Sequence, residues 1–213
     1  MPTYPELKLY IDGKWISRDG RPVLNPADES VLATVPHATQ ADLDDALGAA
    51  ERGFRIWSRT PPAKRAEIIF KATALIRDRV EEMAAAMTLE QGKPIAESRL
   101  EIIRGCEIIE WDAQEGRRIY GRIIPSEPGM RHSVLRQPIG VVAAFSPWNF
   151  PMSSPARKVG GALSAGCSII LKASEETPAG GVPPSQGFPG ARLPPRGLHL
   201  GCLVPPHGFH HLI

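Results

Sequence analysis

Two apolar runs, at residues 139–145 and 168–171, constrain the fold of this chain more than any other feature. The first reads IGVVAAF, and the second reads SIIL and is introduced by Gly166. A continuously apolar run of this length is typical of a β-strand that is covered on both faces. Residues 153–165 between them have a helical pattern. The segment therefore predicts a right-handed β-α-β unit in a parallel sheet.

Polar residues follow both predicted strands, at 146–149 and at 172–175. Ligands of such sheets bind at the carboxyl ends of the strands. Lys172 could donate to the hydroxyl groups of a ribose and Glu175 could accept from them. A carboxylate there would also repel a ribose 2′-phosphate, which favours NAD over NADP. Both side chains could equally be solvated loop charges, and no GxGxxG motif follows the first strand.

Asn149 lies in the turn PWNFP, at 147–151, directly after the first predicted strand. An uncharged amide held between two prolines could donate a hydrogen bond to a developing oxyanion without adding a titrating charge. Asparagine is also common in ordinary turns. The residues alone leave both interpretations open.

The residues before 139 predict a hairpin, further short strands and four helices. Asp12-Gly13 lies between two β-prone runs in KLYIDGKWIS, a typical signal for a two-residue hairpin turn. Extended segments are expected near 23–24 and 30–35, and HSVLRQP predicts an exposed or interface strand. Thr39 is the expected N-cap of the first helix. The other helices are expected after Pro61-Pro62, from Val80, and at about 95–119.

Composition excludes several classes of partner. The chain has 213 residues, 25 basic and 23 acidic side chains and a formal charge of +2, so no excess field favours nucleic acid or a membrane surface. The start, MPTYPELKLYIDGK, has no apolar or Arg-rich leader, and no stretch approaches the roughly 18 apolar residues of a membrane span. A cytoplasmic protein is expected. The three cysteines lack CxxC spacing, which argues against a disulfide framework or a zinc site.

Residues 179–213 differ in character from the rest of the chain. They hold seven prolines and seven glycines but only two charged residues, Arg192 and Arg196. Proline pairs at 183–184, 194–195 and 205–206 remove backbone donors, so neither a helix nor an inner strand is expected there.

Several long motifs occur in an order and spacing that resemble the aldehyde dehydrogenase superfamily. They are YIDGKW, NPAD, TLEQGKP at 88–94, EWDAQEGRRIYG at 110–121, VLRQPIGVVAAFSPWNFP at 134–151 and RKVGGALSAGCSIILKASEETP at 157–178. Within the superfamily the chain is most similar to NAD(P)-dependent succinate-semialdehyde dehydrogenases. The resemblance covers residues 7 to 178, the amino-terminal portion of the family, and the tail after about residue 180 departs from it.

The resemblance implies an α/β fold, with an incomplete Rossmann-like parallel sheet, amino-terminal helices and an extended strand arm. Residues 1–119 would form the hairpin and helical part of the coenzyme-binding domain. Residues 120–138 would form an oligomerisation-type arm, and 139–178 the first β-α-β unit. Residues 179–213 would form a Pro/Gly-rich tail, which we interpret as the product of an altered reading frame. A homo-oligomer of the family type is an expectation of the same kind.

The resemblance also implies roles for individual residues. Asn149 matches the side-chain donor of the oxyanion hole. Arg157 matches an arginine that faces the distal carboxylate of the substrate, although a basic residue beside Lys158 could equally decorate a solvated helix face. The residues that match the cofactor contacts of NAD or NADP are Phe145, Ser146, Pro147 and Trp148 after the first strand, and Lys172, Ser174 and Glu175 after the second.

The family's nucleophilic cysteine, general-base glutamate and glycine-rich turn have no match in this sequence. Cys106 and Cys167 are expected to be small core residues, and Cys202 has no neighbouring base or helix start to lower its pKa. The expected function is therefore that of an oxidoreductase that converts an aldehyde such as succinate semialdehyde to a carboxylic acid, with this chain inactive alone. The alternative is a non-catalytic fragment that binds nucleotide or assembles with a complete subunit.

Overall fold

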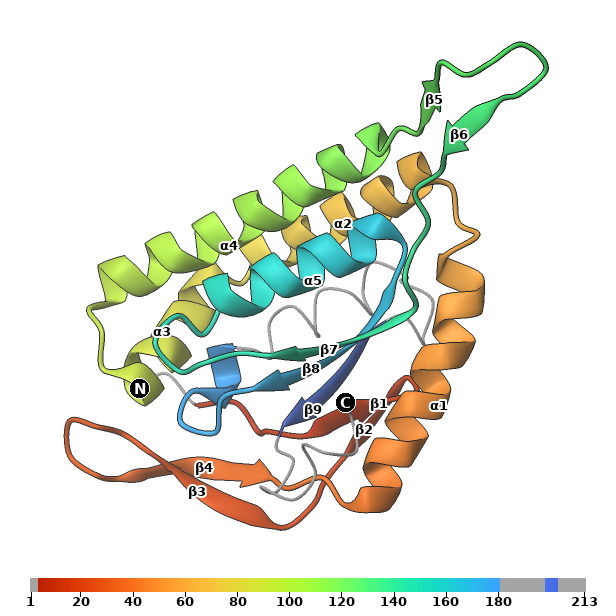
Figure 1. Ribbon diagram of the computed structural model, residues 1–213. Helices are drawn as coiled ribbons and strands as arrows, with labels where there is room; N and C mark the ends of the chain where they lie inside the picture. The colour runs from red at the N-terminus through yellow and green to blue at the C-terminus, as the bar shows by residue number, and fades with distance from the viewer. Residues whose placement is uncertain (1–3, 181–197, 203–213) are drawn as a thin grey trace.

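The computed structural model describes residues 4–180 and 198–202, and its central feature is a five-stranded mixed sheet (Figure 1). The strand order is β2-β1-β9-β8-β7. The strands are β1 (Leu9–Ile11), β2 (Lys14–Ile16), β7 (Val141–Phe145), β8 (Ser168–Ala173) and β9 (Leu198–Cys202). β9, β8 and β7 run parallel, whereas the β1–β2 hairpin extends the sheet with antiparallel strands.

The β-α-β unit predicted from the apolar runs is confirmed. β7 and β8 pair in parallel from Val141 opposite Ser168 to Phe145 opposite Lys172. The helix α5 (Ser153–Ala165) connects them. Gly166 ends this helix with a φ of 94°, a left-handed conformation that glycine adopts without a steric penalty.

Part of the proline-rich tail contradicts the expectation. β9 is an inner strand, parallel to β8 on one side and antiparallel to β1 on the other. The prediction that no inner strand forms is therefore wrong for residues 198–202. The proline pairs at 194–195 and 205–206 lie outside this strand, so its backbone keeps every N–H donor. The expectation for 181–197 and 203–213 falls outside the described residues.

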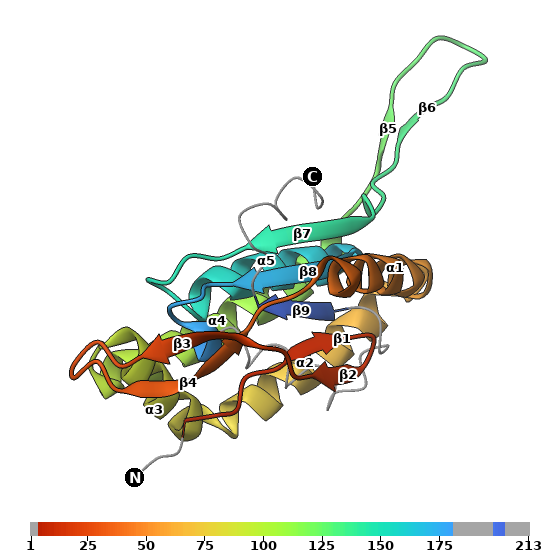
Figure 2. The same ribbon diagram turned by 90° about the horizontal axis from the view of Figure 1, so that it is seen from below.

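The amino-terminal elements have the predicted form. Asp12 and Gly13 make the β1–β2 turn with φ values of 48° and 80°. β3 (Gly20–Leu24) and β4 (Val31–Pro36) form a separate antiparallel pair. β5 (Arg122–Ile124) and β6 (His132–Val134) form a second pair, which projects from the molecule as an arm (Figures 1 and 2).

The helices form the layers around the sheet. They are α1 (Gln40–Trp57), α2 (Pro62–Arg77), α3 (Val80–Gln91) and α4 (Ile95–Glu115), followed by the short helix η1 (Gly116–Arg118). α1 packs on one face of the sheet and α5 on the other, with α4 and α2 behind α5 (Figures 1 and 2). Thr39 caps α1 as predicted, through a reciprocal capping box with Asp42. None of the helices in the described ranges is long and apolar enough to cross a membrane.

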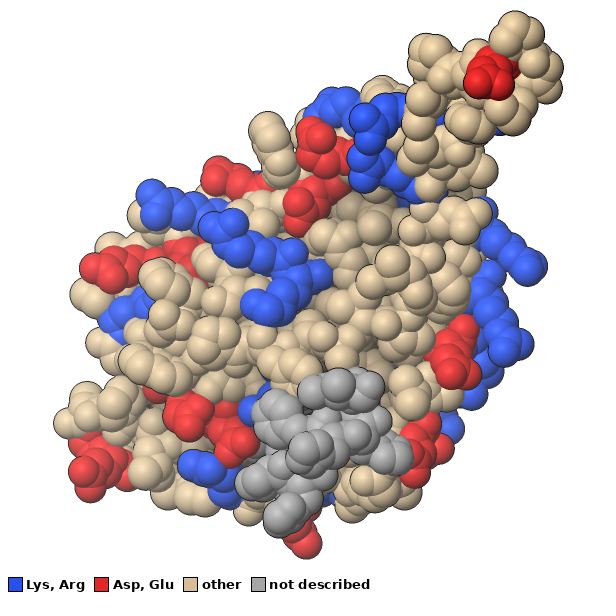
Figure 3. Space-filling model, in the orientation of Figure 1, with Lys and Arg blue, Asp and Glu red and all other residues tan. Residues whose placement is uncertain are grey.

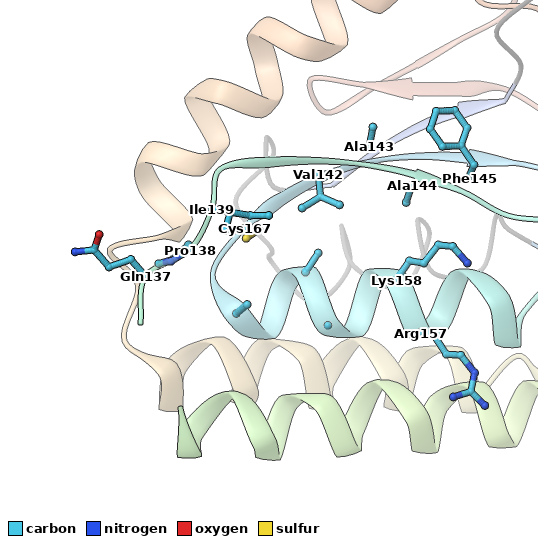
Figure 4. A pocket seen from close by; sticks show the side chains of 13 residues that line it. Gln137, Pro138, Ile139, Val142, Ala143, Ala144, Phe145, Arg157, Lys158 and Cys167 are labelled. Carbon is cyan, nitrogen blue, oxygen red and sulfur yellow. The ribbon is translucent and has the colours of Figure 1, made fainter. Parts of the chain in front are cut away.

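β7 departs from the expectation that both of its faces are covered. Of its residues only Ala144 is buried, and Ala143 is exposed. Within the described residues β7 is the edge strand of the sheet, and a cavity of about 620 Å³ lies between it and α5 (Figure 4). β8, which has a neighbour on each side, is the fully covered strand: Ser168 to Leu171 are all buried.

A carboxylate from α4 fixes the start of α5. Glu101 is buried, and its Oε1 accepts from the backbone N–H groups of Met152 (2.9 Å) and Ser153 (3.1 Å). These groups would otherwise be unsatisfied, because no residue of α5 itself caps the helix with a side chain. The other oxygen of Glu101 pairs with Lys93, whose ammonium also lies 5.1 Å from the centre of the Phe150 ring.

A second carboxylate, that of Glu90 at the end of α3, fixes the segment after β8. It accepts from the backbone N–H groups of Ala179 (2.9 Å) and Gly180 (2.8 Å) and from the hydroxyl of Tyr4. Burial raises the pKa of Glu90 to about 8, although these three donors act in the opposite direction. Glu90 of the TLEQGKP motif thus holds the chain after β8, and Lys93 of the same motif pairs with Glu101, which holds the chain after β7.

The titration of Glu90 predicts how stability depends on pH. Its pKa is higher in the folded state than in the unfolded chain, so its favourable contribution is complete below about pH 4.5 and is lost as the pH rises through about 8. Between pH 5 and 8 we expect the free energy of unfolding to fall by on the order of 3 kcal/mol, because one pKa unit corresponds to about 1.4 kcal/mol. Urea denaturation across this range measures it.

Glu90→Gln should flatten this dependence, because the amide carries no charge and keeps an acceptor oxygen. Glu107→Gln, which changes an exposed residue of α4, is the matched control and should keep the parent's slope. If the free energy of unfolding depends on pH with the same slope in Glu90→Gln and in the parent, the assignment of this dependence to Glu90 is wrong.

Glycines bring α4 and α5 close together. A Cβ atom added to Gly160 would lie 2.6 Å from Oδ2 of Asp112 and 3.1 Å from Cα of Ile109. One added to the adjacent Gly161 would have its nearest neighbour, Asp112, at 3.9 Å. Two neighbouring glycines of the same helix therefore face different amounts of free space.

Gly160→Ala should lower the free energy of unfolding by about 1–3 kcal/mol, because the two helices must move apart. Gly161→Ala, its control, should be neutral or stabilise by up to about 1 kcal/mol, because alanine favours a helix over glycine. Urea denaturation of both variants tests this. Equal free energies of unfolding would show that the close approach of the two helices does not contribute to stability.

Candidate functional site

The two parallel strands end side by side, as their pattern predicts. The backbone N–H of Ser146 donates to the carbonyl of Lys172 (3.0 Å), which continues the pairing of β7 and β8 by one residue. Beyond it, Nζ of Lys172 lies 3.5 Å from Oε1 of Glu175. The residues predicted to bind a ribose are therefore a contacting pair at the carboxyl edge of the sheet. We call residues 146–152 the β7 turn and 174–180 the β8 loop.

Asn149 lies in the β7 turn with its side chain exposed. Among the described residues its amide makes no hydrogen bond, so its N–H groups are available to a ligand. The backbone on either side is fixed: Thr177 Oγ1 of the β8 loop donates to the carbonyl of Trp148 (3.1 Å), and Pro151 and Met152 are buried. Asn149 is thus an open donor on an anchored turn, and its role at an oxyanion stays a prediction.

The anchors of this turn were missed by sequence reasoning. Lys93 and Glu101 hold the start of α5, and Glu90 holds the β8 loop. One signal could have found Glu90: it follows Met83 by seven residues and Met87 by three, which places a carboxylate on the buried face of the helix.

The predicted cofactor residues fit a polar ligand at this edge. Ser146 is buried, and its hydroxyl has no hydrogen-bond partner among the described residues, which is uncommon unless a ligand or water completes the site. Ser174 is buried and donates to Glu176. Pro147 and Trp148 are exposed, and Phe145 is half-buried with its ring pointing away from α5 (Figure 4). The Lys172 ammonium and the Glu175 carboxylate match the hydroxyl groups of a nucleotide ribose as donor and acceptor.

Arg21 of β3 is a further residue that sequence reasoning missed. Its Nη1 donates to Oε2 of Glu175 (2.7 Å), 154 positions away in sequence. Glu175 therefore contacts a cation through each of its two oxygens, Lys172 through one and Arg21 through the other. Its negative charge is largely balanced, which weakens the argument that it would repel a 2′-phosphate.

Arg157 is exposed on α5, and its side chain points away from β7 towards α4 (Figure 4). Its charge acts on Asp112 of α4: burial raises the pKa of Asp112, and Arg157 partly offsets that rise. Its predicted contact with a substrate carboxylate stays a prediction.

Cys106 and Cys167 are buried, as expected for core residues. Burial raises the pKa of the Cys106 thiol to about 11, which disfavours the thiolate a nucleophile needs. Cys167 lines the cavity between β7 and α5 (Figure 4), whereas Cys202 lies on β9, of which only the backbone is described. None of the described cysteine side chains lies in the β7 turn or the β8 loop.

Comparisons with known proteins agree with this arrangement. The chain matches the model of the aldehyde dehydrogenase family over residues 15–200, so the match continues past residue 180, where the sequence motifs predicted a departure. It is 45% identical to 4-(hydroxymethyl)benzenesulfonate dehydrogenase TsaD1 of Comamonas testosteroni, over 81% of this chain and 37% of that protein. It is 41% identical to the NADP(+) succinate-semialdehyde dehydrogenase GabD of Escherichia coli, over 79% of this chain and 36% of that protein.

Solved structures show the same fold. The succinate-semialdehyde dehydrogenase from Burkholderia pseudomallei superposes with a TM-score of 0.90 at 36% identity, covering 94% of this chain and 42% of that one. A benzaldehyde dehydrogenase from Corynebacterium glutamicum, described as NAD-dependent, gives a TM-score of 0.90 at 33% identity. The chain spans about 37% of the length of the first curated relatives. From its match over residues 15–200 and its mixed α/β architecture, the chain belongs to the aldehyde dehydrogenase family and has part of that family's fold.

Proposed function

We propose that this chain supplies the oxyanion donor and part of the cofactor-binding edge of an NAD(P)-dependent aldehyde dehydrogenase. One observation carries the proposal. Asn149 presents an unpaired amide on an anchored turn, and the Lys172–Glu175 pair follows the adjacent parallel strand. An oxyanion donor and a nucleotide site would then share one edge of the sheet, as the oxidation of an aldehyde requires.

Each of these residues would have a distinct task. Lys172 and Glu175 would bind the hydroxyl groups of the adenosine ribose. Bound NAD or NADP supplies the hydride acceptor. Asn149 would donate to the aldehyde oxygen as negative charge develops there during nucleophilic attack on the carbonyl carbon. The Glu101 contacts keep the turn in place, so little reorganisation is needed during reaction.

We further propose that the aldehyde carries a distal anionic group. Relatives of the chain include dehydrogenases named for a benzenesulfonate, for sulfolactaldehyde, for glutarate semialdehyde and for succinate semialdehyde, and each of these compounds carries an acidic group. A cavity of about 310 Å³ beside the β7 turn is lined by Lys93 and Arg104 but also by Glu97 and Glu101, so its formal charge is balanced. The cation that supports the proposal is therefore Arg157 on α5, which forms no ion pair among the described residues. A guanidinium can bind a carboxylate or a sulfonate in a bidentate manner. Succinate semialdehyde is the substrate to test first.

A second function, assembly with another subunit, is favoured by the β5–β6 arm. All six of its strand residues are exposed, and large apolar side chains lie on and beside it, with Ile123 75% and Leu135 76% exposed. Exposed apolar surface of this kind often marks a contact between proteins. Assembly through the arm is compatible with the catalytic proposal, since a chain that lacks a nucleophile would depend on other segments for turnover.

The catalytic proposal is tested by completing the enzyme. Residues 1–178 are joined to the carboxyl-terminal part of GabD, and NADPH formation from succinate semialdehyde is followed. The chimera should turn over, and Asn149→Ala should lower kcat by about 10²–10³-fold, as expected for removal of one oxyanion donor. Gln114→Ala, at an exposed site on α4, is the control and should leave kcat unchanged. An active chimera whose kcat does not respond to Asn149→Ala would refute the role of this residue.

The 213-residue chain alone should form no NADH or NADPH from the same aldehyde. Turnover by this chain that disappears on substitution of one of its three cysteines by serine would contradict the expectation that none of them acts as the nucleophile.

The Arg21 contact predicts a change in cofactor preference. The chain should bind NAD and NADP with dissociation constants within about tenfold of each other, a difference of about 1.4 kcal/mol. Glu175→Gln should strengthen NADP binding relative to NAD, because it removes the carboxylate that contacts both Lys172 and Arg21 and leaves Glu176 as the acidic group that still acts on them. Isothermal titration calorimetry with both cofactors measures this, with Glu107→Gln as control. If the ratio of the dissociation constants for NAD and NADP does not change, the 2′ position of the bound cofactor lies away from Glu175.

A further inference from the structure

A third cavity lies at the amino ends of the parallel strands, whereas Asn149 lies at their carboxyl ends. It has a volume of about 500 Å³ and lies beneath the base of the β5–β6 arm. Its walls are residues 58–61 between α1 and α2, the first turn of α2, the region of η1, and residues 136–138, which precede β7. Because residues 136–138 lead into the amino end of β7, the cavity is separate from the site at the carboxyl ends of the strands.

The cavity is lined by four arginines and by no acidic residue. Arg59, Arg117 and Arg136 are exposed, and none of them forms an ion pair with any residue that the structure describes. Lys and Arg side chains are visible at the base of the arm in Figure 3. Guanidinium groups that share a cavity repel one another, and an anion bound between them would remove that repulsion.

Arg65 forms the buried wall of the cavity and is only 6% exposed. Its Nε donates to the carbonyl of Ser164 (3.2 Å) and its Nη1 to the carbonyl of Thr60 (2.7 Å). Both acceptors are neutral, and no carboxylate in the described residues balances the charge. Burial lowers the pKa of Arg65, which reflects the cost of holding this cation away from water. Buried charges in proteins are normally paired, so a counter-ion is missing here.

The start of α2 adds to the positive potential. The helix is 16 residues long, begins at Pro62 and has no side-chain cap. The partial positive charge of its amino end therefore lies beside the cavity, uncompensated by any acidic residue in its first turn.

We propose that this cavity is a binding site for a small molecule that carries a phosphate or diphosphate group. Its volume lies in the range of about 300–1,000 Å³ that is typical of small-molecule sites. Planar guanidinium groups bind phosphate oxygens in a bidentate manner, and several of them together match a group with more than one negative charge. The ligand supplies the counter-charge that Arg65 lacks, and the exposed arginines close around it.

Isothermal titration calorimetry of the 213-residue chain with inorganic pyrophosphate tests the proposal, with sodium chloride adjusted to a constant ionic strength. Arg117→Gln and Arg136→Gln are the informative variants, because the structure gives neither residue an ion pair to lose. Each should weaken binding by about tenfold, equivalent to about 1.4 kcal/mol. Arg55→Gln, which changes an exposed arginine of α1 outside the cavity, should bind as the parent does. Arg65 is not varied, since it also holds two backbone carbonyls.

Two further measurements distinguish this site from the cofactor edge and from a subunit interface. Lys172→Met should leave pyrophosphate binding unchanged, because Lys172 belongs to the cofactor edge; a loss would place the anion there and overturn the proposal. Light scattering after size-exclusion chromatography compares the mass of the parent with that of each cavity variant. A variant that loses both binding and a subunit contact would identify an interface instead. The proposal would also be overturned if the parent, Arg117→Gln and Arg136→Gln bound pyrophosphate with equal affinity.

Discussion

The carboxyl edge of the sheet depends on two buried glutamates that accept hydrogen bonds from the backbone. Glu101 binds the first N–H groups of α5, and Glu90 binds those of Ala179 and Gly180. Placing a carboxyl group in the interior is costly unless its oxygens are satisfied, and here most of the donors are backbone N–H groups that would themselves lack partners. Each contact thus satisfies two polar groups at once. Lys93 further balances the charge of Glu101.

These contacts position the residues of the candidate site. The β7 turn is held at its far end by Glu101 and at Trp148 by Thr177, so the intervening Asn149 is positioned although its own side chain faces solvent. A donor on such a turn loses little freedom when it binds a developing charge, which is the condition under which a hydrogen bond contributes most to a transition state. The helices of the amino-terminal part are therefore the support of the candidate site.

Local patterns were sufficient to predict the β-α-β unit, the Asp12-Gly13 hairpin and the Lys172–Glu175 pair, because each depends on residues close in sequence. The contact of Arg21 with Glu175 joins residues 154 positions apart, and that of Glu90 with Ala179 joins residues 89 apart. No local pattern encodes such pairs. β9 was missed because the prediction rested on the proline content of the whole tail, whereas the five residues of β9 contain no proline. The exposure of β7 was missed because an apolar run does not reveal how many neighbours a strand has.

The contact between Tyr4 and Glu90 has a practical consequence for handling the protein. The hydroxyl of Tyr4 reaches a carboxylate 86 residues away, and that carboxylate holds the segment after β8. Tyr4 is therefore linked through Glu90 to the β8 loop. Removal of Tyr4 would leave a buried carboxyl group with one donor fewer, so an amino-terminal truncation past this residue would weaken the support of the β8 loop.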